Sequence, residues 1–233
     1  MRVDVSIVVP VFNEEAILHA AVVDLRTRLA DWPLRWELWL AENGSRDGTR
    51  AVADELAERY PEVRCFSIGA ANYGRALREG MARPRGDYGI SDEIELCDAD
   101  LHRAAVAILR GDAAAMVIGS KLMGASRDER PLYRHLTSQI YNGLLQLTLG
   151  FPGTDTHGLK AFRRDVVAPI AARCVVDRDV FASELVIRAY REGVRVREVP
   201  IRLMEKRPPS IRLWRRVPGV VSRLVTLRRV LGD

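Results

Sequence analysis

Cysteine is scarce in this sequence, and its three positions fit neither a disulfide framework nor a metal site. Cys65, Cys97 and Cys174 lie far apart, without the short spacings of zinc or iron–sulfur ligands. Isolated cysteines of this kind behave as small apolar side chains in a reducing compartment. The scarcity therefore excludes a disulfide-stabilised secreted domain, and we expect a cytoplasmic protein.

Long apolar runs are missing as well. No segment approaches the ~20 apolar residues that a membrane-spanning helix needs. The N-terminal MRVDVSIVVP has the pattern of a strand instead of that of a signal peptide. A hydrophobic fraction of 48% with 29% charged residues is ordinary for a globular domain with a full core. We therefore expect a globular protein without a transmembrane span.

The net charge of +5 is unevenly distributed. Seven basic side chains follow one another near the C-terminus: Arg207, Arg212, Arg215, Arg216, Arg223, Arg228 and Arg229. A basic tail favours an anionic partner, and the sequence has no zinc spacing or aromatic-rich sheet pattern that would favour nucleic acid. In this tail (residues 207–233), the segment after Pro218 has an apolar face and an arginine face. It predicts a helix that either lies on an anionic membrane surface or packs on the domain.

Short apolar runs alternate with segments of helical periodicity. The predicted strands are residues 5–12, 36–43, 63–69 and 113–120, and the predicted helices are residues 14–30, 49–60 and 74–82. This alternation predicts an α/β fold over residues 1–206, with a mostly parallel sheet and helices on both faces. Ligands bind at the carboxyl ends of such strands. The polar segments PVFNEE, ENGSRDGT, AANYG and GSK each follow a predicted strand, so we expect the site there.

An ordered series of segments carries a family resemblance. The segments are VVPVFNEE, ENGSRDGT, NYGRALREGM, MVIGSK, RHLTSQIYNGLLQLTLG, GTDTHGLKAFRRDVV and ASELVIRAYREGVRVREVPI. Together they resemble the family 2 glycosyltransferases of the GT-A type, most closely the polyprenyl- and dolichyl-phosphate sugar synthases, over residues 5–213. The resemblance implies a Rossmann-like GT-A domain. It also implies an inverting, metal-dependent transfer of a hexose from a GDP- or UDP-sugar to a polyprenyl phosphate, at the inner face of the membrane.

Two other functions stay open. One is a transferase of the same fold with a hydroxyl acceptor, and the other is a non-catalytic protein that binds a nucleotide sugar. The second stays open because Glu42, Glu93, Glu95 and Lys121 depart from the residues that are usual in the family.

The resemblance also implies the residues of the nucleotide site. Pro10, Phe12 and Glu14 would surround the base and ribose. Glu42 stands where the family usually has an aspartate that recognises the base, and its extra methylene leaves the choice between guanine and uracil open.

Several basic residues are candidates for phosphate binding. Lys121 replaces an arginine that is common in the family and would contact phosphate as a point charge. Arg134 and Ser138 are one helical turn apart and face the same way. Arg207 and Arg212 resemble a basic segment that closes over the diphosphate in the family.

Two pairs of acids compete for the role of metal ligands. The family has an Asp-x-Asp motif that binds Mg²⁺ or Mn²⁺ on the donor diphosphate, and oxygen ligands suit such ions. The letters of the motif occur at Asp98 and Asp100, but an ungapped overlay places Glu93 and Glu95 there. The second register requires a strand that ends at Glu95, and in it Asp98 caps a helix over residues 99–110.

Asp155 and His157 lie in the loop GTDTHGLKAF, and with Arg134 they are the candidate catalytic residues. Such a loop is either a turn with a helix cap or part of an acceptor site, and the matching loop of the family supports the acceptor site. A phosphate acceptor is already anionic and needs no strong base, so positioning and charge stabilisation would supply the rate. A hydroxyl acceptor would need a base, for which Asp155 is the candidate.

Overall fold

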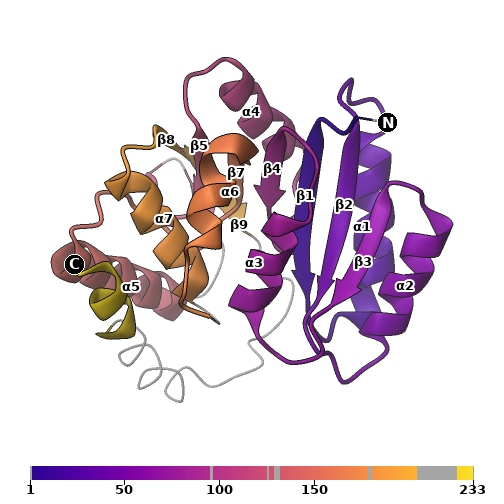
Figure 1. The fold of residues 1–233 in the computed structure, drawn as a ribbon, viewed down its shortest axis with the longest axis horizontal. Helices are drawn as coiled ribbons and strands as arrows, with labels where there is room; N and C mark the ends of the chain where they lie inside the picture. The colour runs from indigo at the N-terminus through magenta and orange to yellow at the C-terminus, as the bar shows by residue number, and fades with distance from the viewer. Residues whose placement is uncertain are drawn as a thin grey trace.

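Seven strands form one sheet with helices on both faces (Figure 1). The computed structural model describes residues 2–94, 97–124, 126–128, 132–177, 180–203 and 225–232. The strands of the sheet are β1 (Val5–Val11), β2 (Trp36–Glu42), β3 (Val63–Ser67), β4 (Tyr88–Ser91), β5 (Met116–Ser120), β7 (Lys160–Arg163) and β8 (Val196–Pro200). Two short strands, β6 (Arg127–Asp128) and β9 (Arg202–Leu203), pair separately with each other.

The helices confirm the periodicity of the sequence. They are α1 (Glu15–Leu29), α2 (Thr49–Arg59), α3 (Tyr73–Ala82), α4 (Ala99–Arg110), α5 (Leu132–Leu149), α6 (Arg164–Ala172) and α7 (Phe181–Arg191), followed by a last helix at residues 225–231. The predicted strands and helices occur with ends that differ by at most three residues. None of the helices in the described ranges has the length and apolar character required to span a bilayer.

The strand order places a switch in direction at β1. The order is β3-β2-β1-β4-β7-β5-β8, so the chain builds outward from β1 to β3 and then returns to add β4 on the other side. All neighbours in this sheet are parallel except β7, which runs antiparallel to both β4 and β5. The predicted α/β class with a mostly parallel sheet is therefore confirmed. Ligand sites in such sheets lie at the carboxyl ends of the strands near the switch.

Two apolar clusters hold the layers together. One cluster joins α1, α2 and α4 to one face of the sheet, and the other joins α3, α6 and α7 to the opposite face. Neighbouring residues of β7 divide between them, since Ala161 belongs to the first cluster and Phe162 to the second. Burial on both faces explains why all seven residues of β1 are buried.

The last helix packs on the domain. Leu227 and Leu231 are buried in the same cluster as α7, while Arg228 and Arg229 are exposed. Arg191 of α7 donates hydrogen bonds to the carbonyls of Leu231 and Leu149, the second at 3.0 Å. The described part of the tail thus has an apolar side, on which Leu227 and Leu231 are covered by protein, and an exposed side with arginines.

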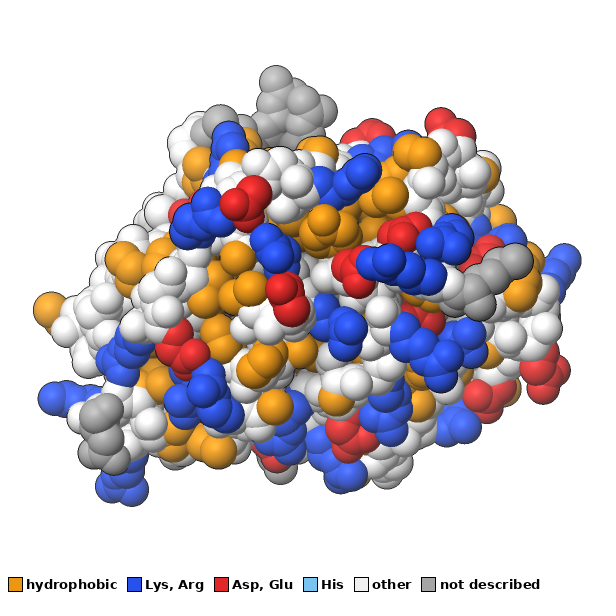
Figure 2. All heavy atoms as spheres, turned by 45° about the horizontal axis from the view of Figure 1, so that its top comes forward, with side chains coloured by type: hydrophobic (Ala, Val, Ile, Leu, Met, Phe, Trp, Pro, Cys, Tyr) orange, Lys and Arg blue, Asp and Glu red, His pale blue; other side chains and the backbone are white. Residues whose placement is uncertain are grey.

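Ion pairs occupy the amino end of the sheet, which is the upper end of β1 and β2 in Figure 1. Asp112 accepts from Arg163 at 3.1 Å and from Arg195 at 2.8 Å. With this end turned forward, Figure 2 shows basic and acidic side chains interleaved over the surface. Several basic side chains at this end are thus paired with carboxylates.

Candidate active site

The carboxyl ends of β1, β2, β4 and β5 form one edge, which also includes the start of β7. Because β7 runs antiparallel, its first residue, Lys160, lies beside Ser91 of β4 and Ile118 of β5. The candidate residues that lie in β1 or in segments at this edge are Pro10, Phe12, Glu14, Glu42, Glu93, Lys121, Asp155 and His157. The edge is therefore the candidate active site.

Two loops that follow β1 and β2 are bonded to each other. Asn13 has the left-handed φ of +55°, and its side chain accepts from the backbone N–H of Arg46 at 2.9 Å. The N–H of Asn13 in turn donates to Ser45 Oγ at 3.1 Å, and the N–H of Glu14 to Thr49 Oγ1 at 2.7 Å. These bonds hold the two loops as one unit.

The three residues predicted to surround the base differ in their exposure to solvent. Phe12 is 40% exposed just beyond β1, and Glu14 is half-buried at the start of α1. Pro10 is buried in β1, opposite Ala41 of β2. Phe12 thus offers an accessible ring at the edge, and the part of Pro10 and Glu14 in base binding stays a prediction.

Glu42 at the end of β2 is turned back onto the protein. Its Oε1 accepts from the N–H of Ser45 at 2.5 Å, and its Oε2 accepts from Ser67 Oγ of β3. Burial raises the pKa of Glu42, but these hydrogen bonds outweigh it and hold the pKa below its usual value. The carboxylate therefore stays ionised and ties the ends of β2 and β3 together.

Close backbone contact fixes the loop after Glu42. Gly44 has φ +70°, and a Cβ at this position would lie 2.6 Å from the carbonyl carbon of Ala70. Asn43 Oδ1 accepts from the N–H of Asn72, the N-cap of α3, at 2.5 Å. Glycine is required here because any side chain would collide with the neighbouring loop.

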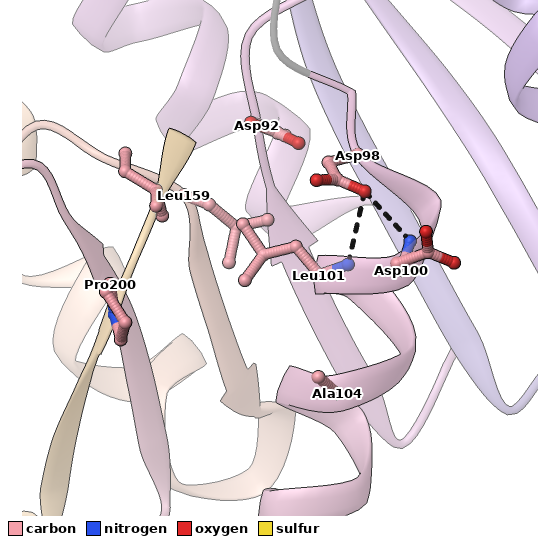
Figure 3. A pocket seen from close by; sticks show the side chains of 8 residues that line it. Asp92, Asp98, Asp100, Leu101, Ala104, Leu159 and Pro200 are labelled. Carbon is pink, nitrogen blue, oxygen red and sulfur yellow. Dashed lines mark hydrogen bonds between the residues drawn. The ribbon is translucent and has the colours of Figure 1, made fainter. Parts of the chain in front are cut away.

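Asp98 and Asp100, the literal match to the metal motif, have structural partners. Asp98 caps α4 and accepts from the N–H groups of Asp100 at 3.0 Å and Leu101 at 3.4 Å, as Figure 3 shows. Both carboxylates also pair with Arg28, at 3.4 and 3.2 Å. The predicted helix cap is confirmed.

The strand β4, which precedes both acid pairs, is shorter than the register with Glu93 and Glu95 as metal ligands requires. We expected a strand that ends at Glu95, but β4 ends at Ser91. Asp92 still bonds through its N–H to the Val8 carbonyl at 3.1 Å, and its Oδ1 then accepts from the N–H of Glu93 at 2.9 Å. That turn ends the ladder. Glu93 is exposed beyond it, and Glu95 lies outside the described residues.

A buried pair that the sequence did not reveal anchors this turn. Asp92 Oδ2 lies 2.7 Å from His102 Nε2 of α4, and both side chains are buried. The pair connects the end of β4 to α4, and no short motif relates residues ten positions apart in this way. It holds the segment that carries Glu93.

A hollow of about 280 Å³ lies between the first turns of α4 and the end of β8 (Figure 3). Its lining combines carboxylates with apolar side chains: Asp92, Asp98, Asp100, Leu101, Ala104, Leu159, Pro200 and Ile201. Glu93 is not among the described residues that line it.

Asp155 and Lys121 form a buried ion pair. Lys121 Nζ lies 2.8 and 3.1 Å from the two carboxylate oxygens, and the N–H groups of Lys121 and His157 donate to the same carboxylate at 3.3 and 3.0 Å. The Asp155 side chain is 0% exposed and that of Lys121 is 10% exposed. Burial raises the pKa of Asp155, but the charge and hydrogen bond of Lys121 outweigh it, so the pKa lies below its usual value.

The loop that carries Asp155 fits tightly against β5. A Cβ on Gly158 would lie 1.6 Å from the Gly119 carbonyl oxygen, so only glycine fits. His157 of the same loop lies half-buried, with Nδ1 3.1 Å from Thr156 Oγ1 and its ring edge-on to Tyr141. The structure thus brings Lys121, Asp155 and His157 together.

The remaining predicted residues are described in part or not at all. Ser138 is half-buried on α5, where its carbonyl accepts from Asn142 Nδ2 at 3.0 Å. Arg134 belongs to the first turn of the same helix, ahead of the side chains that the structure describes. Arg207 and Arg212 lie outside the described residues. Their role in phosphate binding stays a prediction.

Comparison with known proteins agrees with this arrangement. The family model "Glycosyl transferase family 2" matches residues 6–170. Glycosyltransferase AglD of Haloferax volcanii is 29% identical over 96% of this chain and 36% of its own. Dolichyl-phosphate beta-glucosyltransferase ALG5D of Trichomonas vaginalis is 24% identical over 98% of this chain and 73% of its own. The chain therefore spans only about a third of the first relative.

The fold is also that of solved glycosyltransferases. Glucosyl-3-phosphoglycerate synthase from Mycobacterium tuberculosis, solved with Mn²⁺, UDP and glucosyl-3-phosphoglycerate, superposes with a TM-score of 0.67 at 20% identity, over 98% of this chain and 80% of that chain. The same enzyme solved with Mg²⁺ and UDP gives 0.68 at 19% identity. At this level of identity the match establishes the GT-A-like fold alone.

Proposed function

Because this chain belongs to glycosyltransferase family 2, we propose that it moves a hexose from a nucleotide-diphosphate sugar to a polyprenyl phosphate. The family membership identifies the chain as a glycosyltransferase. The proposal concerns the acceptor. The similarity to a protein named dolichyl-phosphate beta-glucosyltransferase supports a lipid phosphate acceptor. Glu42 is the residue expected to recognise the base, but its carboxylate is bonded to Ser45 and Ser67. The proposal therefore includes both UDP and GDP as the donor nucleotide.

The state of Asp155 carries the proposal. A hydroxyl acceptor must lose a proton, and the general base needs an accessible oxygen with a pKa near the working pH. Asp155 is buried, both of its oxygens accept hydrogen bonds, and its pKa lies below the usual value. Such a carboxylate is a poor proton acceptor. A phosphate acceptor avoids the problem because its attacking oxygen is already ionised.

Asp155 is then a positioning residue. It holds the Lys121 ammonium at the end of β5, where 10% of the Lys121 side chain stays exposed. We place this ammonium, with Arg134 and Ser138 of α5, toward the phosphates. Phe12 would cover the base or ribose. The acceptor oxygen bonds to the anomeric carbon as the bond to the diphosphate oxygen breaks, and no proton has to move.

The acids at the edge fit a divalent ion that arrives with the diphosphate. The described residues contain no group of three or more His, Cys, Asp or Glu side chains placed to hold a metal. Mg²⁺ in nucleotide sites commonly takes one or two carboxylates and completes its shell with phosphate oxygens and water. We assign Glu93 and Glu95 as these ligands, because Asp98 and Asp100 already serve α4 and Arg28. When bound, the ion neutralises charge on the leaving diphosphate.

A location at the cytoplasmic face of the membrane belongs to the same proposal. The exposed Arg228 and Arg229 on the last helix would meet anionic head groups. A position at the bilayer surface would bring a lipid-linked acceptor to the edge.

The test compares two acceptors of equal chain length. The protein is incubated with Mn²⁺ and radiolabelled UDP-glucose, UDP-galactose, GDP-mannose or GDP-glucose, together with a short polyprenyl phosphate or the matching polyprenol in detergent. We expect label in the polyprenyl-phosphate product alone, and EDTA should abolish it. Equal transfer to the polyprenol would refute the phosphate acceptor. Binding of nucleotide without transfer to either acceptor would favour a non-catalytic binder.

A further inference from the structure

Glu198 of β8 is a carboxylate to which the proposed function gives no role. It lies on the strand next to β5, in register with Ile118. Its Oε1 accepts from the backbone N–H of Thr154 at 2.7 Å, and its Oε2 accepts from Thr154 Oγ1 at 2.6 Å. A Cβ on Gly153 would lie 2.6 Å from Oε1, so a side chain there would displace the carboxylate. Glu198 therefore holds the residue before Asp155 by two hydrogen bonds.

A chain of hydrogen bonds continues from Thr154 to the segment that carries Lys121. Thr154 Oγ1 lies 2.6 Å from Ser120 Oγ, and Ser120 Oγ accepts from the N–H of Leu122 at 3.2 Å. Glu198 fixes the direction of this chain, because an ionised carboxylate can only accept. The single hydroxyl proton of Thr154 goes to Glu198, so Ser120 must donate its own proton to Thr154.

The chain thus reaches the neighbours of both members of the buried ion pair. Ser120 and Leu122 flank Lys121, and Thr154 precedes Asp155. Ser120 is 0% exposed, so water does not compete for its hydroxyl. The segments that carry the ammonium and the carboxylate are therefore joined twice, once by the ion pair itself and once by the chain that ends on Glu198.

We propose that Glu198 is a positioning residue, which orders these two segments and so holds the Lys121 ammonium where it meets the phosphates of the nucleotide. This inference rests on the phosphate-binding role of Lys121 in the proposed function. A lysine side chain is long and flexible, and ordering it before the ligand arrives removes part of the entropy cost of binding. Glu198 acts through Thr154 and Ser120 and not by contact with the ligand.

Glutamine at position 198 cannot reproduce the chain, although it has nearly the same shape. Its amide offers one oxygen that accepts and one nitrogen that donates. If the nitrogen faces the backbone N–H of Thr154, two donors oppose each other. If the nitrogen faces the Thr154 hydroxyl, the chain must reverse, and the Ser120 proton then opposes the N–H of Leu122. Glu198→Gln therefore breaks one bond of the chain in either orientation.

The experiment measures UDP binding by calorimetry in the presence of Mn²⁺, with GDP in parallel. The variants are Glu198→Gln, Thr154→Val, which removes the hydroxyl of the chain, and Thr154→Ser, which keeps it. Each is made in the wild-type background and in the Lys121→Met background. The control for the lost charge is Glu192→Gln, in an exposed ion pair with Arg173.

Circular dichroism melts verify that each variant is folded. Thr154→Val carries the test if Glu198→Gln does not fold, and Lys121→Gln replaces Lys121→Met if the methionine variant does not fold.

We expect Glu198→Gln and Thr154→Val to weaken nucleotide binding about tenfold, because a misplaced ammonium loses much of its charge-assisted bond to phosphate. Thr154→Ser and Glu192→Gln should stay within about twofold of the wild type. In the Lys121→Met background, Glu198→Gln and Thr154→Val should change the affinity less than about twofold, because the side chain through which they act is gone.

A purely structural role of Glu198 gives a different result, since a loosened loop would weaken binding by the same factor in both backgrounds. Equal factors, or wild-type affinity in folded Glu198→Gln and Thr154→Val, would overturn the positioning role. Wild-type affinity in Lys121→Met, or a wild type that binds neither nucleotide, would overturn it together with the phosphate-binding role of Lys121. The expected binding results without transfer to polyprenyl phosphate would refute the acceptor alone.

Discussion

Lys121 and Asp155 form a buried ion pair, so the effects of replacing them on the free energy of unfolding should be strongly coupled. A double-mutant cycle measures this coupling. The cycle uses Lys121→Met and Asp155→Asn, which remove charge with little change in shape. Removing one partner of a buried ion pair costs about 3–5 kcal/mol because the other charge is left uncompensated. We expect each single substitution to lower the free energy of unfolding by about 3 kcal/mol. Two backbone N–H groups still serve Asp155 in the methionine variant, and the partly exposed Lys121 can turn toward water in the asparagine variant.

The double variant decides the matter, because it leaves no unpaired charge. Its cost should be close to that of one single substitution, which gives a coupling energy of about 2–3 kcal/mol. The assay is urea unfolding followed by tryptophan fluorescence. The matched control is the exposed pair of Arg50 and Asp54, at 2.7 Å on α2, where the coupling should stay below about 0.5 kcal/mol. Additive costs at Lys121 and Asp155 would show that the pair is not the stabilising contact inferred here.

The pH dependence of the same cycle has a definite sign. The pKa of Asp155 in the folded protein lies below its ordinary value of 3.8. The stability from the ionised carboxylate is therefore fully present above pH 3.8 and is lost as the pH falls through the lower folded pKa. The coupling energy should be constant between pH 5 and 7 and decline only in strong acid, within the range where the protein stays folded. A decline that begins near pH 6 would contradict the lowered pKa.

Three further predictions concern the same edge. Asp98→Ala should lower the free energy of unfolding by about 1 kcal/mol through loss of the helix cap, while Mn²⁺-dependent UDP binding stays at the wild-type level; a loss of that binding would restore the literal metal motif. Glu93→Gln should abolish the Mn²⁺-dependent part of nucleotide affinity in calorimetry with little change in melting temperature, and retention of metal dependence would remove Glu93 from the site. Gly158→Ala should cost about 3 kcal/mol or more, since its Cβ would meet a carbonyl oxygen 1.6 Å away; a wild-type melting curve would show that the loop yields easily.

The first half of the fold could be predicted from the sequence because each element has a local signal. β1 is a continuous apolar run, and α1 has apolar residues at helical spacing. The antiparallel β7 has no such signal. It is four residues long and begins with a buried lysine, so its sequence does not resemble a central strand. The early end of β4 was also missed, because it depends on the long-range contact of Asp92 with His102.

The site divides in a similar way. The sequence predicts Lys121 and Asp155 individually as site residues, but their pairing depends on two segments 34 residues apart that only the folded sheet brings together. The part of Glu42 in recognising the base stays a prediction, since its carboxylate is bonded to Ser45 and Ser67 in the structure. A signal for Lys160 did exist. Lysine is rare in this arginine-rich sequence, which has three lysines among 36 basic residues.

The position of β7 has a consequence for synthesis of the chain on the ribosome. Strands β1 to β4 come from the first 91 residues and can assemble as soon as they emerge, but the outer edge of β4 pairs with residues 160–163. Until that segment appears, β4 presents unpaired N–H and C=O groups that can template association with other chains. The nascent protein therefore passes through a long interval with an open edge, in which binding by a chaperone would be most useful.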